Sequence, residues 1–79
     1  MPKLKPIHYE KLIKVFEHEG FRIVRRRGDH ILMTKEGVRR PIVIKSSPRE
    51  VPVTHIKTNL NSAGISRERY FELLGIPGH

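Results

Sequence analysis

The sequence contains no cysteine and no tryptophan, and these absences exclude several ways of stabilising a small fold. Without cysteine, neither a disulfide nor a zinc site with thiolate ligands can hold the fold together. Only two tyrosines and three phenylalanines are present, so the hydrophobic core must be built mainly from aliphatic side chains. We expect a single small domain, residues 1–79, that has a shallow surface site rather than a deep pocket.

Long apolar runs are also missing. No stretch approaches the ~20 apolar residues that a helix needs to cross a bilayer. The first residues, MPKLKPIHYE, lack the apolar centre of a secretory signal. We therefore expect no membrane association and a cytoplasmic location. The final Pro-Gly-His is expected to fray.

Acidic residues are scarce relative to basic ones. Eight Asp and Glu stand against sixteen Lys and Arg, which gives a formal net charge of +8. On so small a domain this charge produces a positive potential that attracts polyanions. Nucleic acid is the first partner class to consider, and an acidic protein is the second. Charge alone also fits a soluble protein that is simply basic.

Apolar residues recur at helical spacing in two segments, and a third short helix is expected near the end of the chain. The first segment, residues 9–19, and the second, residues 52–63, are each followed by a glycine that suits the end of a helix. Ser66 is the expected cap of a short helix that ends at Leu74. The expected buried stripes are Tyr9, Leu12, Ile13 and Phe16 in the first helix and Val53, Ile56, Leu60 and Ala63 in the second.

Three segments between the two main helices have the composition of strands. FRIVRRR and HILMT flank Gly28-Asp29, and a two-residue loop that begins with glycine is a hairpin signal. PIVIK is the third strand, and the following SSPREVP is expected to be a loop. This order predicts an α+β domain with a three-stranded antiparallel sheet, both main helices on one face, and a short C-terminal helix.

The hairpin predicts which side chains share a face of the sheet. A two-residue turn pairs Arg27 with His30, Arg25 with Leu32 and Ile23 with Thr34, and these six residues then lie on one face. The opposite face, which we expect the helices to cover, carries Val24, Arg26, Ile31 and Met33. His30 is therefore expected on the open face between cationic side chains. A turn one residue longer or shorter would reverse this assignment.

That environment permits a specific chemistry at His30. Imidazole titrates near neutrality, so it can take a proton from a nucleophile and return one to a leaving group. Arginine binds phosphate oxygens and stabilises charge that develops during phosphoryl transfer. Together they suit attack by an RNA 2′-hydroxyl on the adjacent phosphate, a step that needs no metal. From spacing alone, a histidine beside arginines on a strand is far more often a surface residue than a catalyst.

Three segments together resemble one known family. GFRIVRRRGDHILM, VTHIKTNLNSAGISRERYFELL and the opening helix are similar to HicA, the small toxin of a toxin–antitoxin system, over about residues 7–74. The resemblance implies a fold like a double-stranded-RNA-binding domain, with the order α-β-β-β-α. It also implies an mRNA interferase without a cofactor, in which His30 is the one essential histidine, and a HicB-type antitoxin as partner. Asp29 stands where the family usually has serine, and its charge is expected to dampen activity.

The remaining basic residues are candidates for binding RNA. Because few aromatic residues accompany them, contacts with phosphate and 2′-hydroxyl groups are expected rather than base stacking on a platform. The predicted RNA-binding residues are Arg25, Arg27, Arg39, Arg40, Lys45 and Lys57. His8, His18, His55 and His79 lack metal-ligand spacing, so no metal is expected. Two further readings stay open: a non-catalytic RNA-binding domain that uses the same surface, and a protein that binds only an acidic partner.

Overall fold

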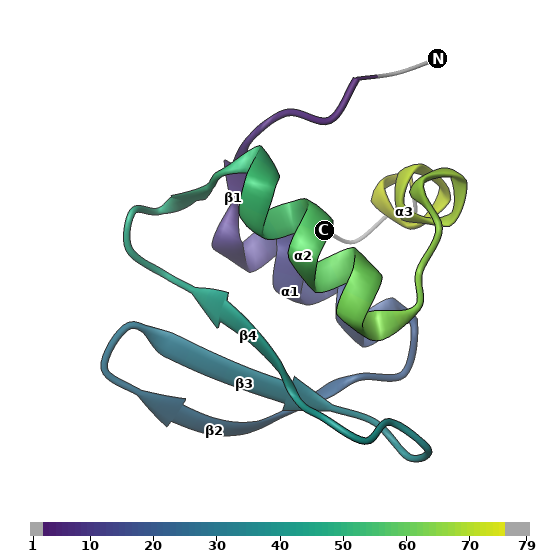
Figure 1. Ribbon diagram of the computed structural model, residues 1–79. Helices are drawn as coiled ribbons and strands as arrows, with labels where there is room; N and C mark the ends of the chain where they lie inside the picture. The colour runs from purple at the N-terminus through teal and green to yellow at the C-terminus, as the bar shows by residue number, and fades with distance from the viewer. Residues whose placement is uncertain (1–2, 76–79) are drawn as a thin grey trace.

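The structure is a computed structural model that describes residues 3–75. The elements are β1 (Ile7–His8), α1 (Tyr9–His18), β2 (Arg22–Arg27), β3 (His30–Thr34), β4 (Ile42–Lys45), β5 (Glu50–Val51), α2 (Val53–Ala63) and α3 (Arg67–Leu74). Helices α1 and α2 lie on the same side of the sheet formed by β2, β3 and β4, and α3 stands beside them (Figure 1). The predicted α+β architecture is confirmed. The Pro-Gly-His that was expected to fray lies outside the described residues.

The main sheet has the strand order β2-β3-β4, with both pairs antiparallel. A second sheet is a two-stranded pair of β1 and β5, and β5 lies within residues 46–52, which were expected to form a loop. In it, Ile7 pairs with Val51 and His8 with Glu50. Strands of two residues show no alternation that a sequence pattern could reveal. The pair fixes the start of α1 beside the segment that leads into α2.

The pairing of β2 with β3 agrees with the prediction only near the hairpin. Arg27 pairs with His30 and Arg25 with Leu32, as expected, but the register then shifts between Ile23 and Arg25. The bulge adds one residue to β2, so Ile23 pairs with Met33 instead of Thr34. The side chains that precede the bulge therefore point to the opposite face from the one predicted. The prediction that Val24 faces the helices is therefore wrong. Val24 is 48% exposed, whereas Ile23 packs against the core.

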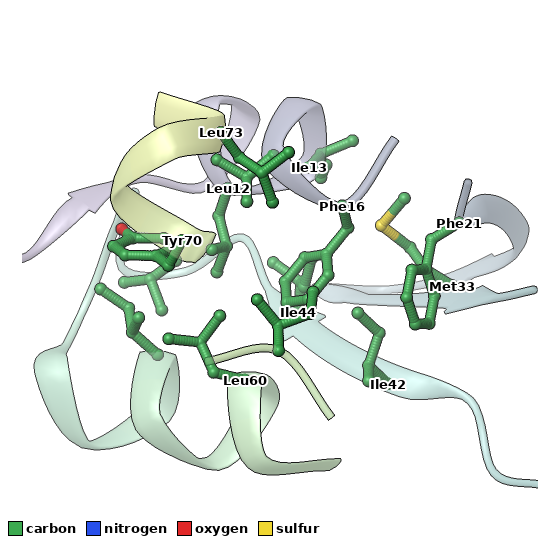
Figure 2. Packing of buried hydrophobic residues seen from close by; sticks show 14 of the residues in the cluster. Leu12, Ile13, Phe16, Phe21, Met33, Ile42, Ile44, Leu60, Tyr70 and Leu73 are labelled. Atoms are coloured by element: carbon green, nitrogen blue, oxygen red, sulfur yellow. The ribbon is translucent and has the colours of Figure 1, made fainter. Parts of the chain in front are cut away.

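The hydrophobic core fills the space between the helices and the covered face of the sheet (Figure 2). Leu12, Ile13, Phe16, Ile56 and Leu60 are buried as their helical spacing predicted, whereas Tyr9, Val53 and Ala63 are only half-buried. The sheet contributes Ile31, Met33, Ile42 and Ile44. Phe21 packs edge-to-face on Phe16, with 5.5 Å between ring centroids, which closes the core under the end of α1.

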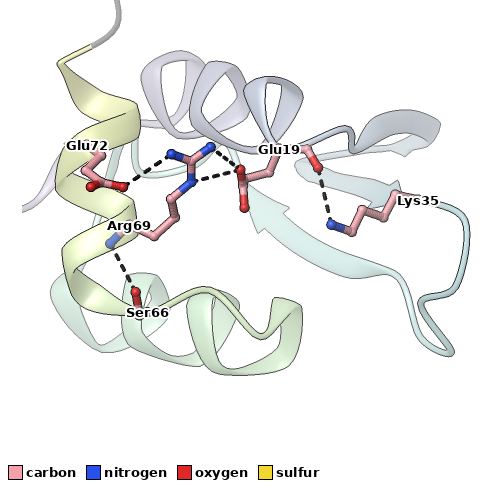
Figure 3. Close-up of polar contacts among 5 residues, drawn as sticks. All are labelled: Glu19, Lys35, Ser66, Arg69 and Glu72. Atoms are coloured by element: carbon pink, nitrogen blue, oxygen red, sulfur yellow. Dashed lines mark hydrogen bonds and ion pairs between the residues drawn. The ribbon is translucent and has the colours of Figure 1, made fainter.

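Helix α3 is capped and tied to the end of α1 by polar contacts (Figure 3). The Ser66 hydroxyl oxygen accepts the backbone N–H of Arg69 at 3.1 Å, which confirms the predicted cap. The Arg69 guanidinium donates to Glu19 Oε1 at 2.8 and 3.0 Å and to Glu72 Oε1 at 3.2 Å. These hydrogen bonds, first of all those to Glu19, raise the pKa of Arg69. Lys35 Nζ donates to the Glu19 carbonyl at 3.3 Å, so the β3–β4 connection is joined to the same corner.

Candidate active site

The turn between β2 and β3 holds His30 at the first position of its strand. Gly28 has φ +58°, and Asp29 lies at a negative φ, the combination of a hairpin turn that needs glycine first. The end of β4 fastens this turn, because the Ser46 N–H donates to the Asp29 carbonyl at 2.8 Å. The Ser46 hydroxyl donates to the same oxygen at 3.4 Å. The backbone that carries His30 is thus held from both neighbouring strands.

The His30 side chain is half-exposed, at 51%, and contacts the carboxylate beside it. Its Nδ1 lies 3.0 Å from Asp29 Oδ1. A carboxylate at this distance favours the tautomer in which Nδ1 carries the proton, which leaves Nε2 with a free lone pair. Asp29 is therefore placed to influence which nitrogen acts as a base.

Cationic side chains stand on both sides of His30 on the open face, the sheet face turned away from the helices. Arg27 is its direct partner on β2, and Lys45 its direct partner on β4. Side chains of directly paired residues have Cβ atoms about 4.5–5.5 Å apart. Arg25 lies two residues from Arg27 on the same strand and face. The structure thus brings together three of the predicted RNA-binding residues around His30.

The other three predicted RNA-binding residues lie away from His30. Arg39 and Arg40 precede β4, whose far end carries Lys45, so they are at the opposite end of the sheet. Lys57 is on α2, where successive residues are about 100° apart around the helix axis. It points away from the side of α2 that faces the sheet edge. All three are exposed, but they do not join the surroundings of the histidine.

A shallow hollow of about 200 Å³ opens beside His30 at the free edge of β4. Strands β3 and β4 form one side of it, and α2 forms the other. Its lining is His30, Val43, Lys45, His55, Thr58 and Asn59. No role was predicted for Thr58 and Asn59, and His55 was considered only as a metal ligand. His55, Thr58 and Asn59 are spaced at i, i+3 and i+4, so they form a polar stripe beside the apolar stripe of α2. That spacing is the signal in the sequence that could have identified them.

Within residues 3–75, no three His, Cys, Asp or Glu side chains converge as a group that could hold a metal ion. No helix in the same range is long and apolar enough to span a bilayer.

The chain was also compared with known proteins. The family model described as "HicA toxin of bacterial toxin-antitoxin" matches residues 9–65, which is more than half of the chain. That segment begins at α1 and ends after α2, so it includes His30, its cationic neighbours and the hollow. No curated protein and no solved structure matched. The chain therefore belongs to the HicA family, the toxins of bacterial toxin–antitoxin systems, and its partner class is an antitoxin.

Proposed function

We propose that this toxin is a metal-independent endoribonuclease, an mRNA interferase, in which His30 is the catalytic base. One observation supports this most strongly. A half-exposed imidazole has its Nδ1 3.0 Å from Asp29 Oδ1, and Arg27 and Lys45 are its direct partners on the two neighbouring strands. Cleavage by an internal nucleophile requires a base for the attacking hydroxyl and cations for the phosphate, and here a base beside a carboxylate lies among such cations.

The reaction proceeds by transfer within the RNA backbone. His30 Nε2 takes the proton of a 2′-hydroxyl, whose oxygen attacks the adjacent phosphorus. As the new P–O2′ bond forms, the P–O5′ bond breaks, and the leaving 5′ oxygen takes a proton from water. The products are a 2′,3′-cyclic phosphate and a 5′-hydroxyl. Arg27 and Lys45 stabilise the negative charge that develops on the phosphate oxygens.

The remaining cations have a supporting role in this proposal. Arg25 extends the basic surface along β2, whereas Arg39, Arg40 and Lys57 contact the backbone of longer RNA away from the reacting phosphate. A HicB-type antitoxin silences the toxin by covering the open face. Cleavage of transcripts then stops translation and growth whenever the antitoxin is removed.

A second candidate function is RNA binding without cleavage. It is favoured by the exposure of Arg25, Arg26 and Arg27, which would bind phosphate whether or not His30 reacts. The two functions predict different results for the same variant. Under the second, His30→Ala would alter RNA affinity slightly and nothing else.

The test is cleavage of RNA by purified wild-type protein and by His30→Ala in the presence of EDTA. Mass spectrometry of the products identifies the new ends. We expect 2′,3′-cyclic phosphate and 5′-hydroxyl ends from the wild type, no cleavage above background from His30→Ala, and loss of growth arrest when the variant is expressed. His18→Ala serves as a matched control, because His18 is an exposed residue at the end of α1 and does not line the hollow beside His30. Equal cleavage by wild type and His30→Ala would refute the proposal.

A further inference from the structure

The hollow beside His30 has a second imidazole on its opposite wall. His30 reaches it from β3 and Lys45 from β4, whereas His55 reaches it from α2. Because β4 is the edge strand on which α2 packs, Lys45 stands between the two histidines in the order of the elements. The His55 side chain is exposed, and neither of its ring nitrogens has a hydrogen-bond or ion-pair partner within residues 3–75. Both nitrogens can therefore contact a ligand in the hollow.

The proposed cleavage needs a proton donor on the side of the phosphorus opposite the base. In a displacement at phosphorus the attacking and leaving oxygens lie roughly in line, so the 2′ oxygen and the 5′ oxygen are on opposite sides. A group that gives a proton to the leaving oxygen must therefore face His30 across the phosphate. The volume of about 200 Å³ is below the ~300 Å³ of pockets for drug-sized ligands, a size suited to a single phosphodiester linkage between the two walls.

The other polar side chains that line the hollow do not suit this role. Thr58 donates its hydroxyl proton to the Thr54 carbonyl at 3.0 Å. Asn59 is buried, and a carboxamide is not an acid at neutral pH. Lys45 is the phosphate-binding cation of the proposed reaction, and an alkylammonium releases its proton far less readily than an imidazolium at neutral pH. Imidazole titrates near neutrality, so His55 is the residue on the α2 wall that can hold a proton and deliver it.

From this arrangement, and resting on the proposed function, we infer that His55 is the general acid of the cleavage. The imidazole of His55 takes a proton from bulk water before the reaction. As the P–O5′ bond breaks, the imidazolium donates that proton to the leaving 5′ oxygen, so that a hydroxyl leaves rather than an alkoxide. His30 meanwhile holds the proton of the 2′-hydroxyl. After the products leave, His30 loses its proton to water and His55 gains one, which restores the starting state.

The test replaces the leaving oxygen with sulfur. Mass spectrometry of the products first locates the bond that the wild type cuts, and the oligoribonucleotide is then made with sulfur in place of the bridging 5′ oxygen at that bond. A thiolate leaves without a proton, because thiols are far stronger acids than alcohols. At saturating protein, we expect His55→Ala to lower the single-turnover rate constant roughly 10²–10⁴-fold on the oxygen substrate and to cleave the sulfur substrate within about three-fold of the wild type.

Three further variants assign the loss to proton transfer. His30→Ala should be slow on both substrates, because the attacking hydroxyl still needs a base. His55→Gln keeps a polar side chain that cannot act as an acid, so it should behave like His55→Ala. His18→Ala changes an exposed histidine outside the hollow and should cleave both substrates like the wild type.

Two results for His55→Ala would overturn the inference. One is cleavage of the oxygen substrate within about three-fold of the wild type, and the other is an equally large loss on both substrates, which indicates a binding or structural role. Rescue of His30→Ala by sulfur would reverse the two assignments and overturn it as well. A wild type that cleaves no RNA refutes the proposed function and this inference with it. If the wild type cleaves, His30→Ala is inactive and His55→Ala is fully active, only this inference fails.

Discussion

Replacing Asn59 with leucine should make the toxin more stable. Asn59 is buried in α2 with an amide nitrogen that has no acceptor among residues 3–75. A buried polar group without a partner destabilises a protein by about 1–3 kcal/mol. Leucine has a similar branched shape and adds helix propensity of roughly 0.5 kcal/mol. The expected gain in free energy of unfolding is therefore about 1–3 kcal/mol.

Thermal and urea unfolding followed by circular dichroism would measure this gain. For a domain of this size, 1 kcal/mol shifts Tm by roughly 4–8 °C, so Asn59→Leu should raise it by about 4–24 °C. Asn61→Leu is the matched control, because it places the same residue at an exposed position of α2 and reports only the propensity. An Asn59→Leu protein whose Tm is equal to or below that of the control would refute the reasoning. Such a result would show that the Asn59 amide has a hydrogen-bond partner in solution.

Three further predictions concern a core hydroxyl, the histidine's partner and the basic surface. Burial raises the pKa of Tyr70 from 10.0 to about 12, and its hydroxyl has no partner within residues 3–75. A raised pKa in the folded state means that stability is fully present below pH 10 and falls as the pH rises toward 12. We expect a loss of about 1–2 kcal/mol, which denaturant titrations should find absent in Tyr70→Phe. Asp29→Ala should lower the single-turnover rate constant roughly 10- to 100-fold, because the imidazole loses the neighbouring acceptor; a higher rate constant would show instead that the carboxylate dampens activity. Arg27→Gln should reduce the slope of log affinity against log salt concentration by about 0.7 in filter-binding assays, the contribution of one phosphate contact on single-stranded RNA. Arg39→Gln, at the other end of the sheet, should leave the rate constant of bound RNA unchanged.

Much of the fold follows from local patterns that can be read directly from the sequence. The helical spacing of Leu12, Phe16 and Ile56 predicted which faces of α1 and α2 are buried. The Gly28-Asp29 turn predicted the pairing of Arg27 with His30. These signals are reliable because each depends on a few neighbouring residues and on one dominant interaction.

The failures have a different physical origin. No residue in β2 marks the bulge that exposes Val24 and turns Ile23 toward the core. The pairing of Ile7 with Val51 joins segments far apart in the chain, so neither shows it alone. Asn59 was overlooked because an isolated asparagine in an amphipathic helix is ordinarily exposed. Only the packing of α2 on the edge of β4 brings it to the hollow beside His30.

The central claim is that His30 removes the proton from the attacking 2′-hydroxyl. Its most direct test is the single-turnover rate constant for cleavage of one defined oligoribonucleotide, measured for wild type and for His30→Ala at matched RNA occupancy. We predict a fall of roughly 10²–10⁴-fold, the usual contribution of a positioned acid or base, and no cleavage by either protein when the scissile nucleotide carries 2′-deoxyribose. A His30→Ala rate constant within two- or three-fold of wild type, or cleavage of the deoxy substrate at the wild-type rate, would contradict the account.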